Sequence, residues 1–256
     1  MKRRNFLTAS VLAGSGAMFS SFTPKKTDQQ LLEWIQFKFV TNAKRGKLED
    51  FLGDVVVPGL NKQGCSPIGG FRPMYGAHGG DLFMLIPHKS FDSMLNAWNN
   101  LVEDTAFAKA ADSSINDPLY YRMESSLMLA FEDLPTIEVP ENIKGKQGRI
   151  FEIRTYESHN RLKGKLKVEM FNDGGEIALF KKTGLNPVFF GETIVGPLMP
   201  NLTYMLGFEN IDQRNANWPV FGGSDEWKKM SSNPRYAETV SNITDNILTA
   251  ASFSQI

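Results

Sequence analysis

Residues 149–156, with the sequence RIFEIRTY, carry side chains whose types and spacing could bind a ligand. The strict alternation predicts a β-strand that places Glu152, Arg154 and Tyr156 on one face and apolar side chains on the other. Arginine can hold a carboxylate or phosphate through two parallel hydrogen bonds, and a nearby glutamate can act as a general base. The charged face of this strand is therefore the first candidate binding site.

A second group of residues, Glu209, Arg214 and Trp218, follows another predicted strand over residues 203–208. If the charged face lies beneath helices, its charges must be paired, because an unpaired buried charge costs several kcal/mol. We therefore expect one network among four residues: Glu152, Arg154, Glu209 and Arg214. That network could bind a ligand, or it could be a structural ion-pair network that holds sheet and helix in register. The pattern assigns no catalytic residue.

The remaining reactive side chains are three histidines and a single cysteine. His78 lies in a glycine-rich turn, where it could reach a metal or heme iron or could simply be an exposed turn residue. His88 is expected to be a solvated loop histidine, and His159 lies in a polar loop. A lone Cys65 forms no intrachain disulfide, and these spacings match no metal-ligand or nucleotide motif, so we predict no metal site and no cofactor.

Composition limits the classes of partner. The chain has 256 residues, of which 41% are hydrophobic, so it can bury a sizeable core. Lys and Arg total 28, as do Asp and Glu, so the formal net charge is zero. A neutral chain lacks the basic field that attracts nucleic acid, and we expect no nucleic-acid partner.

The N-terminus has the composition of an export signal. A basic stretch, Lys2 to Arg4, precedes a modestly apolar run over residues 6–22 that is too short and too weakly apolar to span a membrane comfortably. The order Arg-Arg-Asn-Phe-Leu over residues 3–7 resembles a twin-arginine signal, although an ordinary secretory signal or a disordered start remains open. We expect residues 1–26 to direct the protein to the periplasm or outside, with no stable membrane anchor in the mature chain.

The mature chain begins with a β-α-β-β-α order of predicted elements. These are a strand at 31–40, a helix at 44–63 broken by Pro58-Gly59, strands at 71–75 and 82–86, and a helix at 91–102. This order is close to half of a ferredoxin-like fold.

The second half of the chain repeats the first. A shift of 120 residues superposes like residues: Pro67 on Pro187, Trp98 on Trp218, and Phe107 on Trp227. A period of this size predicts two copies of one domain, at 30–133 and 149–256, joined by a linker at 134–148 that is rich in Pro, Gly and charge. The predicted fold class is α+β, with two tandem ferredoxin-like modules.

The downstream pattern resembles the NIPSNAP family, with its E-x-R-x-Y strand and following R…W…W. The matching residues are Glu152, Arg154, Tyr156, Arg214, Trp218 and Trp227. The resemblance implies a ferredoxin-like module that pairs its antiparallel sheet with a second one as a dimeric α/β barrel, and it implies no particular reaction. Two modules in one chain can pair with each other as a pseudo-dimer, and two chains can still associate as a homodimer.

Two functions remain open from the sequence. The leading one is binding of a small molecule or protein partner in a pocket between sheet and helices of the second module, because the first module has Ile35 and Phe37 where Arg154 and Tyr156 stand. The alternative, which rests on fold analogy, is a cofactor-poor monooxygenase or heme-handling enzyme of the dimeric α/β-barrel class. Such an enzyme should have a cavity that combines a His, Asn or Tyr with an aromatic side chain. The four tryptophans, with Trp34 and Trp98 in the first module, are otherwise expected to pack in the core.

Overall fold

The computed structural model describes residues 28–113 and 117–256, so the predicted signal at 1–26 lies outside the described residues. The first half contains β1 (Leu31–Lys38), α1 (Asn42–Phe51), a π-helical segment (Leu52–Val56), α2 (Val57–Lys62), β2 (Gly69–Tyr75), β3 (Leu82–His88), α3 (Phe91–Val102), α4 (Thr105–Ser113) and β4 (Arg122–Ala130). The second half contains β5 (Ile150–Glu157), α5 (Arg161–Phe171), α6 (Glu176–Lys182), β6 (Asn186–Val195), β7 (Asn201–Phe208), α7 (Ile211–Gly223), α8 (Asp225–Ser231), a 3-10 segment (Pro234–Tyr236) and β8 (Asn242–Ala250).

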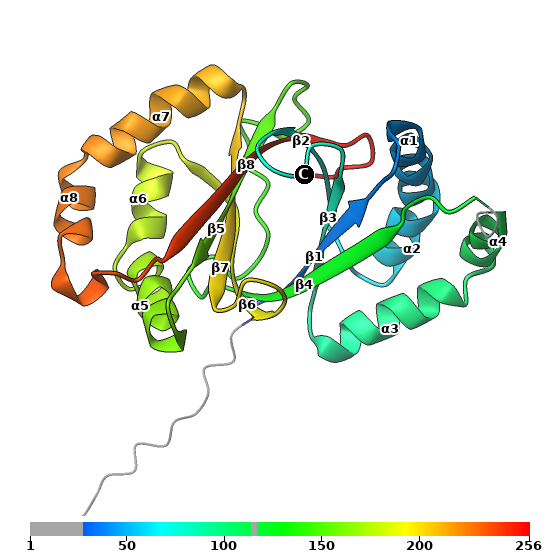
Figure 1. The fold of residues 1–256 in the computed structure, drawn as a ribbon, viewed down its shortest axis with the longest axis horizontal. Helices are drawn as coiled ribbons and strands as arrows, with labels where there is room; N and C mark the ends of the chain where they lie inside the picture. Colours follow the sequence, from blue (N-terminus) through cyan, green and yellow to red (C-terminus); the bar gives the residue numbers. More distant parts are fainter. Residues whose placement is uncertain (1–27, 114–116) are drawn as a thin grey trace, which may run out of the picture.

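The strands close into one antiparallel barrel in the order β1-β3-β2-β8-β5-β7-β6-β4. Each half supplies a four-stranded sheet with the ferredoxin-like order, β4-β1-β3-β2 or β8-β5-β7-β6, and the sheets join at β2–β8 and β4–β6. Figure 1 shows the barrel in the middle, with α1–α4 outside one sheet and α5–α8 outside the other. The predicted fold class is confirmed, and closure leaves no sheet edge unpaired.

Strand alternation divides the core into three layers. Along β1, Leu32 and Trp34 point into the barrel, whereas Glu33 and Ile35 point under the helices of the first half. Along β5, Phe151 and Ile153 point into the barrel, and the charged face lies under the helices of the second half. The strands therefore separate the charged face of residues 149–156 from the barrel interior.

The segment predicted to be a linker also fills one end of the barrel. Ile137 and Ile143 are buried there together with Ile256. Gly207 permits this packing, because a Cβ atom at that position would lie only 2.4 Å from the Cδ1 atom of Ile143. The segment thus contributes apolar side chains to the core that both halves share.

One helix departs from the prediction. The chain stays helical from α1 through the π-helical segment to Lys62, so the predicted break at Pro58-Gly59 is wrong. Pro58 occupies the first turn of α2, and a π-helical segment directly precedes it. A proline inside a helix removes one backbone hydrogen bond, and the π-helical segment directly before Pro58 marks the point where the hydrogen-bond register of the helix changes.

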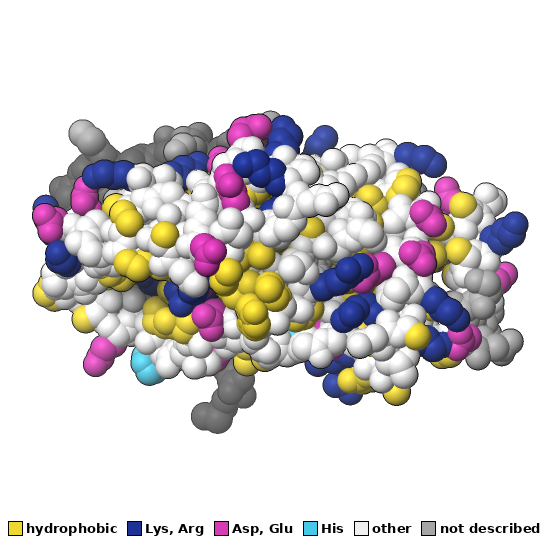
Figure 2. Space-filling view, turned by 90° about the horizontal axis from the view of Figure 1, so that it is seen from above, with side chains coloured by type: hydrophobic (Ala, Val, Ile, Leu, Met, Phe, Trp, Pro, Cys, Tyr) yellow, Lys and Arg dark blue, Asp and Glu magenta, His cyan; other side chains and the backbone are white. Residues whose placement is uncertain are grey.

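Within residues 28–113 and 117–256, no helix is long and apolar enough to cross a membrane. Over the same residues, no group of three or more His, Cys, Asp or Glu side chains could hold a metal ion. Figure 2 shows Lys and Arg side chains interspersed with Asp and Glu over the face seen from above, while apolar side chains gather near its middle.

Candidate functional site

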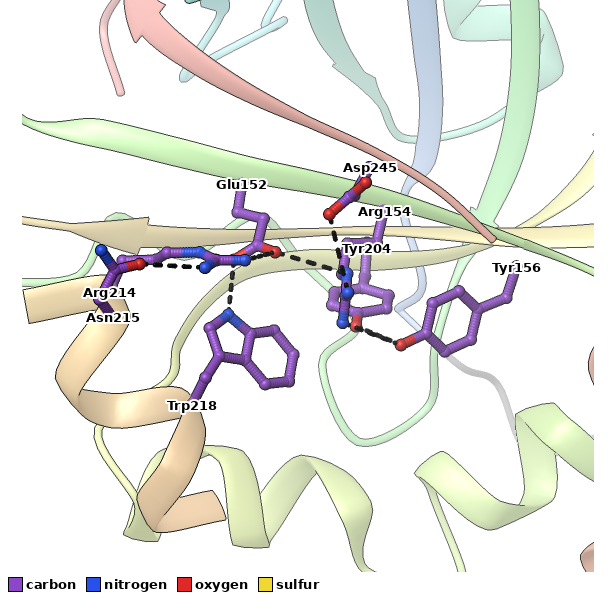
Figure 3. Close-up of polar contacts among 8 residues, drawn as sticks. All are labelled: Glu152, Arg154, Tyr156, Tyr204, Arg214, Asn215, Trp218 and Asp245. Carbon is purple, nitrogen blue, oxygen red and sulfur yellow. Dashed lines mark hydrogen bonds and ion pairs between the residues drawn. The ribbon is translucent and has the colours of Figure 1, made fainter. Parts of the chain in front are cut away.

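Glu152 on β5 is the centre of the polar cluster beneath the helices of the second half (Figure 3). Its carboxylate is fully buried and accepts hydrogen bonds from Arg214 at 2.9 and 2.7 Å and from the Nε1 atom of Trp218 at 2.6 Å. Both partners lie on α7, whose first turn is capped by the side chain of Asn210. The bidentate pair therefore fixes α7 against β5, which is the structural role that the sequence left open.

Arg154 lies beside this carboxylate but uses few of its own donors. Its Nε atom is buried without a hydrogen-bond partner in the described part of the chain and lies 3.4 Å from Glu152. One terminal nitrogen donates to the Tyr156 hydroxyl at 3.3 Å, and another lies 3.8 Å from the Asp245 carboxylate. The guanidinium packs over Trp218 at 4.6 Å from the ring centroid, and its side chain is 20% exposed. The Arg154 side chain is thus partly exposed, while its buried Nε atom is left without a hydrogen-bond partner among the described residues.

The pKa of Arg154 is consistent with a permanent cation. Burial acts to lower it, but the neighbouring Tyr204, Tyr156 and Glu152 oxygens outweigh burial and raise the pKa above its ordinary value. The Tyr156 hydroxyl is 2.9 Å from that of Tyr204 on β7. Burial raises the pKa of both phenols, so both stay protonated beside the guanidinium.

A second buried ion pair lies under the same aromatic side chains. Lys167 on α5 donates to Glu176 on α6 at 2.8 Å, and both side chains are buried. The ammonium also lies 4.6 Å from the ring centroid of Phe171 and 5.6 Å from that of Tyr156. Burial raises the pKa of Glu176, although the adjacent ammonium opposes this shift.

The structure brings together five of the six predicted ligand-binding residues: Glu152, Arg154, Tyr156, Arg214 and Trp218. Glu209 is the exception, and its expected place in the network is wrong. It follows the last residue of β7 and pairs instead with Lys146 at 3.0 Å, with its side chain 38% exposed. The phenol of Tyr204 and the carboxylate of Asp245 join the cluster, and the sequence analysis missed both residues. Alternate residues of a strand lie on the same face, so the strand predicted at 203–208 would have placed Tyr204 on the face of Leu206, beneath the helices.

The first half of the chain provides an internal comparison. There Glu33 accepts a hydrogen bond from the Nε1 atom of Trp98 at 2.9 Å, as Glu152 does from Trp218. The positions of the cationic and phenolic side chains are apolar in the first half: Ile35, Phe37 and Met84 stand where Arg154, Tyr156 and Tyr204 stand. The Glu–Trp contact is thus common to both modules, whereas the Arg–Tyr–Tyr group is not needed for this packing.

His88 and Cys65 are buried, which corrects the expectation of a solvated histidine. The Nε2 atom of His88 lies 3.0 Å from Glu33, and its Nδ1 atom lies 3.5 Å from the Cys65 sulfur. Burial, aided by the charge of Glu33, raises the pKa of the Cys65 thiol to about 11. The cysteine is therefore a protonated core residue with low nucleophilicity.

A cavity of about 130 Å³ opens at one end of the barrel, opposite the end that residues 134–148 fill. His78 and Leu198, from the loops after β2 and β6, lie at this end, and Trp34 and Phe83 form an aromatic wall. Asn246 also lines the cavity. It lies inside the barrel, on the opposite face of β5 from Arg154.

Comparison with solved structures supports the barrel fold over most of the chain. A structure from Lactobacillus acidophilus NCFM, provisionally classed as a monooxygenase, has a TM-score of 0.60 at 10% identity and covers 89% of this chain and 97% of its own. A second, from Fusobacterium nucleatum and classed in the same way, has a TM-score of 0.55 at 9% identity and covers 88% and 93%. At these identities the likeness establishes the fold alone.

Sequence comparison relates one half of the chain to a family. A search of curated proteins finds no match to this chain. The model of the NIPSNAP family matches residues 151–255, which begin in β5 and include the whole Glu152 cluster. The second half of the chain is therefore similar to the NIPSNAP family, and the chain as a whole has the fold of an eight-stranded α/β barrel.

Proposed function

We propose that the protein binds a small organic anion between the sheet and the helices of its second half, with Arg154 as the anchor. The observation that carries this proposal is the Arg154 side chain, which is 20% exposed and whose Nε atom has no hydrogen-bond partner among the described residues, at a position where the first half buries Ile35. A carboxylate would take the free donors in the bidentate geometry that arginine favours. Asp245 is 51% exposed on its side chain and can move aside when the anion enters.

The surrounding side chains support an anion that carries an apolar or aromatic body. Trp218 and Tyr156 flank the guanidinium at 4.6 and 5.9 Å from their ring centroids. Glu152 accepts three hydrogen bonds from Arg214 and Trp218, so it has partners other than Arg154. We assign no catalytic step to this group of residues.

The test replaces the group with the side chains of the first half. The triple variant Arg154→Ile, Tyr156→Phe, Tyr204→Met should fold, because the first half packs the same side chains at these positions. Benzoate is a suitable carboxylate probe, and its binding to the mature protein can be measured by isothermal titration calorimetry. We expect binding to fall at least about tenfold, which corresponds to about 1.4 kcal/mol.

The matched control is Arg235→Met, which removes an exposed arginine of the same half that pairs with Glu169. The control should bind benzoate as the unmodified protein does. Equal binding by the triple variant, or no binding by the unmodified protein, would show that Arg154 is not an anion anchor.

We also propose that the protein is exported through its N-terminal segment by the twin-arginine route. The proposal rests on residues 3–7 of the sequence. Replacing Arg3 and Arg4 together by lysine should leave the protein in the cytoplasm, as followed by cell fractionation. Unchanged export of that variant would point to an ordinary secretory signal instead.

A cofactor-poor monooxygenase or heme-handling enzyme is the second candidate function. The supporting observation is that His78, Asn246 and Trp34 line one cavity, which is the combination expected of such an enzyme. Protein purified from its own compartment should then show a Soret band or consume oxygen with an electron-rich phenol. A colourless protein that consumes no oxygen contradicts this candidate and leaves anion binding untouched.

A further inference from the structure

The cavity at the open end of the barrel has walls from both halves of the chain. Trp34, Phe83 and His78 come from the first half, and Thr203 and Asn246 come from the second. Trp34 stacks on Phe83 with ring centroids 5.1 Å apart and an interplanar angle of 17°. The first half thus supplies a flat aromatic wall, and the second half completes the cavity with polar side chains.

The lining combines apolar and polar side chains and carries almost no charge. Among the described residues that line the cavity there is no Lys, Arg, Asp or Glu. Most of its polar groups are already paired with each other or with the backbone. Thr155 bonds to Thr203 at 2.9 Å, and Asn201 accepts from Thr193 at 2.6 Å. A charged ligand would lose its hydration without gaining an opposite charge, so the cavity favours a neutral molecule.

Asn246 lines this cavity, and its buried side-chain oxygen is an acceptor without a hydrogen-bond partner among the described residues. The amide is only 8% exposed, and Gly76 makes room for it, because a Cβ atom there would lie 2.4 Å from that oxygen. A buried acceptor without a donor is destabilising, so a ligand that brings a donor to it gains free energy.

The backbone at the mouth of the cavity is also unusual. Three non-glycine residues of the described chain have positive φ, and two of them, His78 at 71° and Leu198 at 60°, line this cavity. Leucine at positive φ is a genuine outlier, and such strain concentrates at ligand sites. The imidazole of His78 is oriented by Gln36, which lies 3.1 Å from its Nδ1 atom and also donates to Asp81 at 2.6 Å.

We infer that the barrel-end cavity is a binding site for a small, neutral, flat ring that carries one hydrogen-bond donor. The ring stacks in the aromatic part of the cavity, and its O–H or N–H group donates to the Asn246 oxygen. The volume of about 130 Å³ is close to that of a cavity of about 150 Å³ that holds benzene in another protein. This site is separate from Arg154, and binding of a ring in the cavity does not depend on what binds at Arg154.

Fluorine NMR with matched probes tests the inference on the mature protein. 4-Fluorophenol has the ring and the donor, 4-fluoroanisole lacks the donor, and 4-fluorobenzoate is charged. We expect 4-fluorophenol to bind at least about fivefold more tightly than 4-fluoroanisole, because the methyl ether leaves the acceptor unpaired. We expect 4-fluorobenzoate to be unaffected by substitutions in this cavity.

Two amide variants separate the site from general effects on stability. Asn246→Leu removes the acceptor, and Asn61→Leu removes the other buried amide oxygen without a partner, which lies on α2 away from the cavity. Both variants should unfold at the same or a higher temperature than the unmodified protein, because each removes an unsatisfied polar atom. Only Asn246→Leu should weaken the binding of 4-fluorophenol, by about fivefold or more.

Three outcomes would overturn the inference. The first is equal binding of 4-fluorophenol and 4-fluoroanisole, and the second is unchanged binding of 4-fluorophenol to Asn246→Leu. The third is no binding of either ring at about 10 mM, which would mean that the cavity holds only water. None of these outcomes affects the benzoate test of Arg154.

Discussion

Replacing Glu152 by glutamine should be among the most destabilising isosteric changes in the second half of the protein. The carboxylate is fully buried and accepts two hydrogen bonds from Arg214 and one from Trp218. Glutamine keeps one acceptor oxygen, but its amide group turns two N–H donors toward the donors of Arg214. The substitution therefore removes the charge that compensates a guanidinium at the α7–β5 contact.

The magnitude follows from this geometry. Breaking a buried ion pair by removing one partner costs about 3–5 kcal/mol. For a chain of this length, about 1 kcal/mol lowers the melting temperature by about 2–4 °C, so a decrease of roughly 6–20 °C is expected. Urea unfolding followed by circular dichroism gives the free energy directly, and the slope with denaturant should stay unchanged.

Glu169→Gln is the matched control, because Glu169 pairs with Arg235 on the surface of the same half, with its side chain 27% exposed. A surface pair contributes little to stability, so this variant should unfold close to the unmodified protein. The reasoning is refuted if Glu152→Gln costs no more than Glu169→Gln. A double variant of Glu152→Leu with Arg214→Met should be more stable than Glu152→Gln, since it also removes the guanidinium that Glu152→Gln leaves without its carboxylate.

Two further predictions concern buried titratable groups. Lys167→Met leaves the buried carboxylate of Glu176 unpaired and should lower the free energy of unfolding in urea by about 3–5 kcal/mol at neutral pH. The double variant Lys167→Met with Glu176→Leu should recover most of this stability. An equal loss in both variants would contradict the ion-pair account. For Cys65, the folded pKa of about 11 exceeds the ordinary 9.0, so the protein should lose stability as pH rises from about 9 to 11, and Cys65→Ala should remove that loss. A thiol with this pKa is about 0.1% ionised at pH 8, so Ellman's reagent should react with it only on unfolding, and rapid labelling of the native protein would refute its burial.

The pairing of the two halves has a consequence for where binding sites arise. The sheets of the two halves pair at β2–β8 and β4–β6 and share the barrel interior, whereas each sheet–helix layer is built largely within one half and can diverge independently. The first layer keeps the Glu33–Trp98 contact and adds His88 and Ser125 to it, whereas the second carries Arg154 and its tyrosines. The barrel interior belongs to both halves and supplies a cavity that neither would form alone.

The sequence by itself determined the fold class and the face on which the charged cluster lies. Alternation along 149–156 separates Glu152 and Arg154 from Phe151 and Ile153, and the structure keeps this division. These features are local, because the period of a strand is fixed by the residues within it. The like residues spaced 120 apart likewise indicated two modules without any knowledge of contacts.

Only the tertiary structure decided which distant side chains meet. Tyr204 joins Arg154 through the β5–β7 register, while Glu209, just past the end of β7, turns to Lys146. Cys65 and His88 meet across a separation of 23 residues, and the cavity around Asn246 draws on loops and strands from both halves. Register and barrel closure are set by the packing of the whole chain, so no local pattern specifies these contacts.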